Sequence, residues 1–121
     1  CTRGKLCPYQ TFTSGENHNF NERTKKGFGK PLTPTNFPAP DGVVWHLLLP
    51  AGKGWGAGDQ LRFKVQTLKE RIDVINAEGG AITFDVPISS KGEIPQKILQ
   101  GFQELGTYKS RLNDGVKSFL D

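Results

Sequence analysis

The pattern of apolar and polar positions predicts four strands in the middle of the chain. Residues 43–50 are apolar apart from His46, which is typical of a strand buried on both faces. Alternating apolar and polar residues predict three more strands, over 61–66, 71–76 and 82–86. A turn signal, Glu78-Gly79-Gly80, separates the last two of these strands, and Pro87 follows the final one.

Beyond these strands the apolar period lengthens from two residues to nearly four, which indicates a helix. The apolar residues of its expected face are Ile94, Ile98, Leu99, Phe102 and Leu105. Pro95 suits the first turn of such a helix and Gly106 suits its end. A similar but less regular pattern over 108–120 allows a second helix. We therefore expect an α+β fold in which one or two C-terminal helices cover an antiparallel sheet.

The first forty residues lack this periodicity. They contain thirteen Gly, Pro or Asn residues, and four prolines between residues 31 and 40 disfavour a helix and interrupt strand pairing. The prediction is an extended N-terminal arm over 1–40, pinned at a few phenylalanines, followed by an α+β domain over 41–121. At 121 residues the chain has the length of one ordinary domain.

Positive charge is concentrated at the beginning of the chain. Residues 1–30 carry six basic and two acidic side chains, whereas basic and acidic side chains balance over residues 31–121. A basic end on a neutral body is typical of docking onto an acidic surface, although it can also serve solubility. The predicted mechanism is an arm that is disordered alone and becomes ordered on an acidic partner, with attraction that weakens in salt.

The two cysteines leave three possibilities open. Cys1 and Cys7 are expected to form a disulfide in an oxidising compartment and to stay free thiols in a reducing one. Cys1 could instead carry a lipid, as in bacterial lipoproteins. The initial cysteine and the absence of methionine suggest a mature form whose targeting segment has been removed. The longest apolar run, Val43–Leu49, is far shorter than the ~20 residues that cross a bilayer.

No catalytic motif stands out. The glycine-rich loop Gly52–Gly58 lacks the spacing of a nucleotide-binding loop, and the chain has no GxSxG sequence. His18 is a lone candidate metal ligand, and the position of His46 in an apolar run favours a structural role. The sequence therefore predicts no enzyme activity, no metal and no cofactor. The alternative is a ribonuclease that uses His46 as acid or base, with its other catalytic residues drawn from Glu70, Asp73 and Arg62.

Stacking on nucleic-acid bases would require exposed aromatic side chains among basic ones. Phe28 lies near Lys25, Lys26 and Lys30, and Trp55 lies near Lys53. We expect both aromatic side chains to pack against the body of the protein, so nucleic acid is not an expected partner.

One segment resembles the PsbP family, the extrinsic lumenal subunits of photosystem II. The matching positions are Phe28-Gly29-Lys30-Pro31, Thr35, Phe37, Gly42 and Leu47-Leu48-Leu49-Pro50, in the family's spacing. Downstream, Lys53 and Trp55 resemble the family's Lys-Trp pair with one extra glycine, and Gln60–Phe63 and Gly92–Gly106 resemble a strand and a helix of the family. The likeness is absent before residue 27. The family's domain continues with more strands and a terminal helix where this chain stops at Asp121, so the expectation is a shortened or diverged member.

The resemblance implies a protein without enzyme activity that binds the lumenal face of photosystem II. Such subunits help to retain the calcium and chloride of the oxygen-evolving cluster, and their basic side chains meet acidic surfaces of the photosystem core. The implied location is the thylakoid lumen, peripheral to the membrane, with a secreted or periplasmic protein as the alternative. Of the predicted contact residues, only Lys30, Lys53 and Trp55 lie on the resemblance, and the others are assigned by charge.

The predicted function is therefore docking onto a large acidic membrane-protein complex. The residues predicted to bind the partner are Arg3, Lys5, Arg23, Lys25, Lys26, Lys30, Lys53 and Trp55. A small secreted basic ribonuclease or toxin, and a lipid-anchored bacterial surface protein, are the alternatives.

Overall fold

The computed structural model describes residues 8–107, which form two compact units. The described residues up to Leu49, together with Arg71–Phe84, make up the first unit. Pro50–Glu70 and the described residues from Asp85 onward make up the second unit. Each unit has its own buried apolar side chains.

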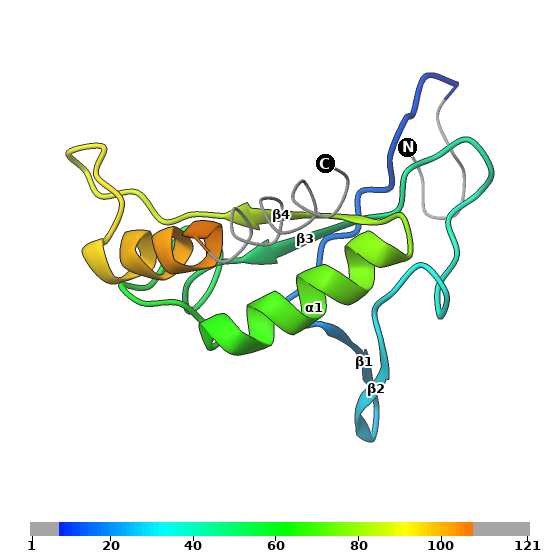
Figure 1. The fold of residues 1–121 in the computed structure, drawn as a ribbon, viewed down its shortest axis with the longest axis horizontal. Helices are drawn as coiled ribbons and strands as arrows, with labels where there is room; N and C mark the ends of the chain where they lie inside the picture. The colour runs from blue at the N-terminus through cyan, green and yellow to red at the C-terminus, as the bar shows by residue number, and fades with distance from the viewer. Residues whose placement is uncertain (1–7, 108–121) are drawn as a thin grey trace, which may run out of the picture. The chain divides into compact units, whose positions relative to one another are not determined.

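The chain contains four short strands and two helices over its described length, which confirms the α+β class (Figure 1). The labelled elements are β1 (Asn21–Thr24), β2 (Gly27–Pro31), β3 (His46–Pro50), α1 (Val65–Ala77) and β4 (Ala81–Asp85). An unlabelled helix, orange in Figure 1, covers 96–107. The strands form two sheets of two strands each, β1–β2 and β3–β4.

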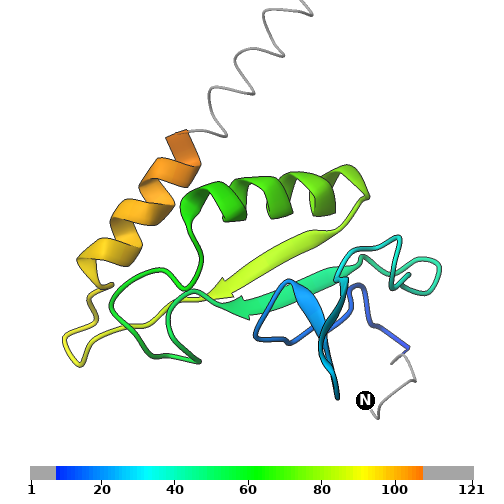
Figure 2. The same ribbon diagram turned by 90° about the horizontal axis from the view of Figure 1, so that it is seen from below.

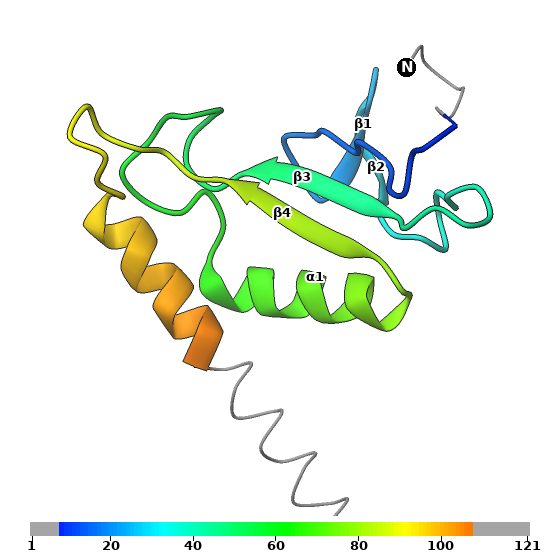
Figure 3. The ribbon, with the colours of Figure 1, turned by 90° about the horizontal axis from the view of Figure 1, so that it is seen from above.

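The two sheets differ in strand direction. β1 and β2 are antiparallel, with Thr24 opposite Gly27 and Arg23 opposite Phe28. β3 and β4 run in the same direction, as their arrowheads show in Figures 1 and 3. The hydrogen bonds also indicate parallel strands. The Ala81 N–H donates to the carbonyl of Trp45, and the side chain of His46 bonds that of Thr83, so the partner's residue number rises along both strands. Parallel strands require a long crossover connection, and α1 supplies it.

The prediction of strands over 61–66 and 71–76 is wrong, because α1 occupies most of that stretch. Val65, Leu68, Ile72 and Ile75 follow a spacing of three to four residues, and Leu68 and Ile75 are each 1% exposed. The helical spacing, and not the alternation, therefore determines which side chains of this stretch are buried. Val74, which the strand pattern placed on the same face as Ile72, is 45% exposed.

The predicted turn at residues 78–80 is confirmed as the end of α1. Gly79 has a φ of +83°, which glycine adopts without steric cost. The Gly79 N–H donates to the carbonyl of Asn76 and the Gly80 N–H to that of Ile75, at 3.0 and 2.9 Å. These two bonds are those of a Schellman motif, which satisfies carbonyls that the helix itself leaves unpaired.

Residues 11–17 are paired with β3 and with Val44 just before it, whereas the sequence analysis expected an extended arm that is disordered alone. The Thr13 and Asn17 N–H groups donate to the carbonyls of Val44 and Leu48, each at 2.9 Å, and the bridges are parallel. Phe20 is only 4% exposed. Because these residues are built into the first unit, that unit extends across the expected boundary at residue 40.

The buried side chains explain why each unit holds together. In the first unit they are Phe20, Trp45, Leu47, Leu49 and Ile75, and in the second Ala51, Leu68, Ile98 and Leu105. Around Gly80 the side chains of Ile75, Trp45 and Pro34 converge, so a Cβ at residue 80 would lie only 2.8 Å from the nearest atoms. Within residues 8–107, no helix combines the length and the apolar character of a membrane span.

The predicted helix near the C-terminus is present, with bounds shifted by about two residues. The carbonyl of Pro95 accepts from the N–H groups of Ile98 and Leu99, both at 3.0 Å, in the first turn. Ile94 precedes the helix and is 41% exposed, and Gly106 lies inside the helix. The second predicted helix, over 108–120, lies outside the described residues.

Candidate functional site

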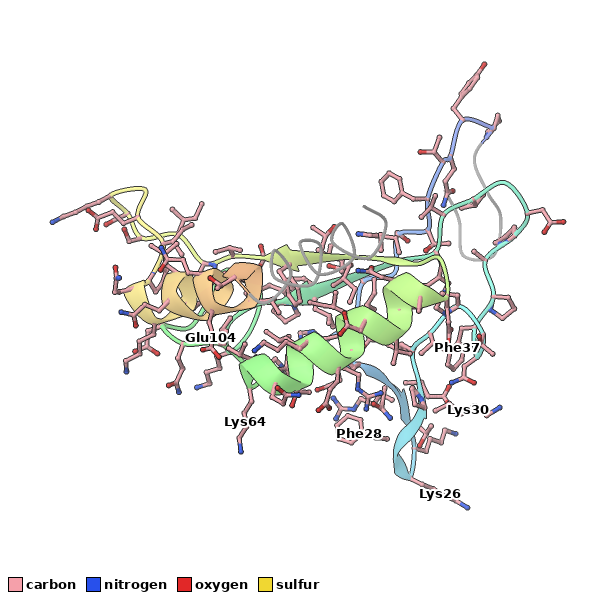
Figure 4. The ribbon with its side chains drawn as sticks, in the orientation of Figure 1. Lys26, Phe28, Lys30, Phe37, Lys64 and Glu104 are labelled. Atoms are coloured by element: carbon pink, nitrogen blue, oxygen red, sulfur yellow. The ribbon has the colours of Figure 1, made fainter. Side chains whose placement is uncertain are left out.

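The β1–β2 hairpin carries four of the eight predicted partner-binding residues. Lys25 and Lys26 form its turn, and Gly27 follows with a φ of +121°. This positive φ closes the turn at a position where a side chain would be strained. Figures 2 and 4 show the hairpin as a two-stranded ribbon with its turn at the free end.

Polar side chains hold the hairpin in shape. The Asn21 amide donates to the carbonyl of Gly29 at 3.0 Å, and the Thr24 hydroxyl donates to that of Gly27 at 3.1 Å. The strand register shifts between Asn21 and Arg23, and Glu22 fills this irregularity. Its carboxylate accepts from the Lys30 N–H at 3.2 Å and lies where a side chain on Gly29 would have to be. The hairpin is therefore ordered without a buried core of its own.

The four cations of the hairpin face solvent. Arg23, Lys25, Lys26 and Lys30 are all exposed, and within residues 8–107 none of them forms an ion pair. Figure 4 shows the side chain of Lys26 extending from the turn and that of Lys30 extending outward from β2. Exposed and uncompensated cations keep their charge available to an acidic partner.

Phe28 does not pack against the body of the protein as expected. It is 68% exposed and lies opposite Arg23 in the strand register. The sequence pattern could not show this, because Phe28 sits in a strand of a two-stranded ribbon that buries neither face. An exposed aromatic side chain among cations gives the hairpin an apolar contact as well as charge.

Lys53 and Trp55 belong to the second unit, in the loop that follows β3. Lys53 is exposed, whereas Trp55 is 36% exposed and therefore partly covered. The loop is held by Arg62, whose guanidinium donates to the Lys53 carbonyl at 2.7 Å, and by the Asp85 carboxylate, which accepts from the Gly56 N–H. These two residues and the hairpin are in different units. Four further predicted residues, Arg3, Lys5, Cys1 and Cys7, lie outside the described residues.

His46, on β3, makes hydrogen bonds to Thr13 and to Thr83 on β4. Its Nδ1 lies 3.0 Å from the carbonyl oxygen of Thr13, so this nitrogen must be the donor, and its Nε2 lies 2.8 Å from the Thr83 hydroxyl. The ring also meets Phe12 edge-on at 5.3 Å between centroids. This arrangement supports the structural role predicted for His46. The ribonuclease alternative gains no support from this arrangement, because both ring nitrogens of His46 already have hydrogen-bond partners.

A cavity of about 260 Å³ opens beside His46 in the first unit. Its polar wall includes Thr13, Glu16, Asn17 and His46, and its apolar wall includes Leu32, Phe37, Pro38, Pro40 and Trp45. The sequence analysis did not predict this cavity, because Leu32 and three separate segments, around residues 13–17, 37–40 and 45–47, build its walls. The signal that could have found it is the run of prolines and a phenylalanine just before a buried tryptophan.

Glu78 fixes the segment that leads into this cavity wall. Its carboxylate accepts from the Thr35 N–H at 2.9 Å, across 43 residues of sequence. This backbone hydrogen bond, helped by the hydroxyls of Thr35 and Thr33, lowers the pKa of Glu78, while partial desolvation opposes the shift. Because Glu78 follows α1, the contact ties the end of the helix to residues 33–36.

Metal-ligating side chains are not grouped in the described part of the chain. No set of three or more His, Cys, Asp and Glu residues within 8–107 is arranged to hold an ion. His18 is exposed, and its backbone N–H donates to the Asn17 side chain at 2.7 Å.

No protein-family model, curated protein or solved structure matches this chain.

Proposed function

We propose that this chain is a binding module that docks onto an acidic protein surface through the β1–β2 hairpin. The observation that carries the proposal is the grouping of four exposed cations and one exposed phenylalanine on a single ordered hairpin. Docking through this element requires no catalytic residue, cofactor or metal.

The energetics require the cations to act together. One exposed ion pair contributes only ~0–1 kcal/mol, so four would supply at most a few kcal/mol. Covering Phe28 on binding would add about 1.5–3 kcal/mol, because it is largely exposed in the free protein. The hairpin is already ordered, so binding would cost less conformational entropy than the folding of a disordered arm.

The narrower form of the proposal names the partner as the lumenal face of photosystem II. Its support is the resemblance of residues 28–50 to the PsbP family. Within that segment, Phe28-Gly29-Lys30-Pro31 forms most of β2 of this chain. On this proposal the protein is a peripheral, non-enzymatic subunit in the thylakoid lumen. There it would support the oxygen-evolving cluster and its retention of calcium and chloride.

Charge reversal on the hairpin tests the general proposal. The triple variant Arg23→Glu, Lys25→Glu, Lys26→Glu is compared with the triple variant Lys64→Glu, Lys91→Glu, Lys97→Glu, which reverses three exposed cations of the second unit. A surface coated with poly-glutamate serves as the acidic probe. We expect the hairpin variant to lose at least tenfold in affinity, whereas the control variant loses much less. Equal losses in the two variants would show that net charge, not the hairpin, drives binding.

Membranes test the narrower proposal. Photosystem II membranes stripped of their extrinsic subunits should retain the wild-type protein at low salt and release it at about 1 M salt, where the screening length falls to ~3 Å. Membranes that lack photosystem II are the control. If the protein binds the poly-glutamate surface but does not bind photosystem II membranes selectively, photosystem II is not the partner, and the proposal of docking onto an acidic surface stands. Tighter binding to single-stranded RNA than to poly-glutamate would overturn both.

A further inference from the structure

The cavity beside His46 is lined by none of the hairpin's cations. Glu16, an exposed residue, is the one acidic residue that lines it, and no lysine or arginine does. Both ring nitrogens of His46 are occupied, by Thr13 and Thr83. The His46 ring therefore offers a ligand a surface to pack against but no free hydrogen-bonding group. An occupant would therefore meet one negative charge and a largely apolar surface.

The walls are fixed before any ligand arrives. The Trp45 indole N–H donates to the carbonyl of Phe37 at 2.8 Å, which joins two sides of the cavity. The Thr13 hydroxyl accepts from the His46 N–H at 2.8 Å and bonds the His46 carbonyl at 3.1 Å. Gly15, with a φ of +48°, lies so close to β3 that a Cβ would collide with the His46 carbonyl oxygen. A cavity held in this way loses little entropy when it binds a ligand.

We propose that this cavity binds a small organic ammonium ion. The ammonium group would pair with the Glu16 carboxylate through a charge-assisted hydrogen bond. The hydrocarbon part would lie against Phe37, Pro38, Pro40 and Trp45. The volume of about 260 Å³ is below the ~300–1,000 Å³ of most ligand pockets, so the ligand has only a few carbon atoms. A free amine of this size is the occupant to which we commit.

The test uses n-butylammonium as the probe and n-butanol as its neutral analogue of similar size. Binding to the full chain is followed at pH 8 by calorimetry and by the NMR signal of the Trp45 indole N–H. We expect n-butylammonium to shift this signal and to bind about threefold to fivefold more tightly than n-butanol, because Glu16 is exposed and one exposed ion pair contributes at most ~1 kcal/mol. Glu16→Gln should remove most of that preference, whereas Glu70→Gln, which makes the same change in the second unit, should leave it intact.

Three outcomes would overturn the proposal. These are equal binding of n-butylammonium and n-butanol, unchanged binding in Glu16→Gln, and an indole signal of Trp45 that does not respond. The Thr13 and Asn17 amide signals check that Glu16→Gln keeps the pairing with β3, so loss of binding is not loss of fold. A lysine-containing peptide that binds tenfold more tightly than n-butylammonium would overturn the free amine as occupant. The outcome of this test does not depend on whether the hairpin binds poly-glutamate, because none of the hairpin's cations lines the cavity.

Discussion

The β1–β2 hairpin and strand β3 belong to the same compact unit but are held in opposite ways. In β3, Leu47 and Leu49 are 2% and 0% exposed, so burial of apolar side chains fixes the strand. In the hairpin no residue is buried, and the side chains of Asn21, Glu22 and Thr24 fix it by hydrogen bonds to the backbone.

This difference separates stability from binding. A core strand such as β3 tolerates few substitutions, because each apolar side chain fills a closely packed site. The cations of the hairpin are exposed and form no ion pair within the described residues, so their substitution changes the charge offered to a partner without removing a contact that stabilises the fold. We therefore expect substitutions in β3 to change the free energy of unfolding and substitutions of the hairpin's cations to change binding alone.

The largest expected effect is that of Leu49→Ala. Leu49 is completely buried, and truncation of such a leucine costs about 2–5 kcal/mol through lost transfer free energy and the cavity that remains. Leu48→Ala is the matched control, because Leu48 is the next residue on the strand and is only partly buried. Urea unfolding followed by circular dichroism measures both. Equal losses in the two variants would contradict the assignment of the buried face of β3.

A smaller and local effect is expected for Glu22→Ala. The substitution removes the acceptor of the Lys30 N–H, a bond worth about 0.5–1.5 kcal/mol. Amide hydrogen exchange at Lys30 should speed up by roughly threefold to tenfold, whereas the free energy of unfolding of the whole unit changes little. Glu22→Gln keeps an acceptor oxygen at the same place, so its exchange rate should stay closer to that of the wild type. Faster exchange throughout β3 in Glu22→Ala would show that the hairpin and the core unfold together.

The sequence predicted the parts of the fold that depend on burial. The apolar run over 43–50 became β3, the alternation over 82–86 became β4, and Gly79 ended an element as expected. The prediction of strands over 61–66 and 71–76 was wrong, because Ile72 and Val74 fit alternation over a short window while the longer spacing from Val65 to Ile75 fits a helix. A window of about 11 residues or more separates the two periods, and a six-residue window does not.

The candidate site was predicted less completely, for a different physical reason. The cations at residues 23–30 could be seen from charge alone, but their display on a hairpin depends on hydrogen bonds from Asn21, Glu22 and Thr24, which leave no periodic signal. The cavity was missed because its walls meet through the pairing of residues 11–17 with β3. Polar contacts between distant segments, such as that of Glu78 with Thr35, are set by the folded backbone and not by local pattern.

The smallest effect expected is a pH dependence from Glu78. The Thr35 N–H holds the pKa of Glu78 below its ordinary value of 4.5, so the folded state favours the carboxylate. The stabilisation is therefore present above that ordinary value and is lost as the pH falls through the lower pKa of the folded state. An NMR titration should show the Thr35 amide and the Glu78 carboxyl moving together, below the ordinary glutamate range. Glu78→Gln should abolish this titration of Thr35, and a Glu78 carboxyl that titrates at or above 4.5 would contradict the contact.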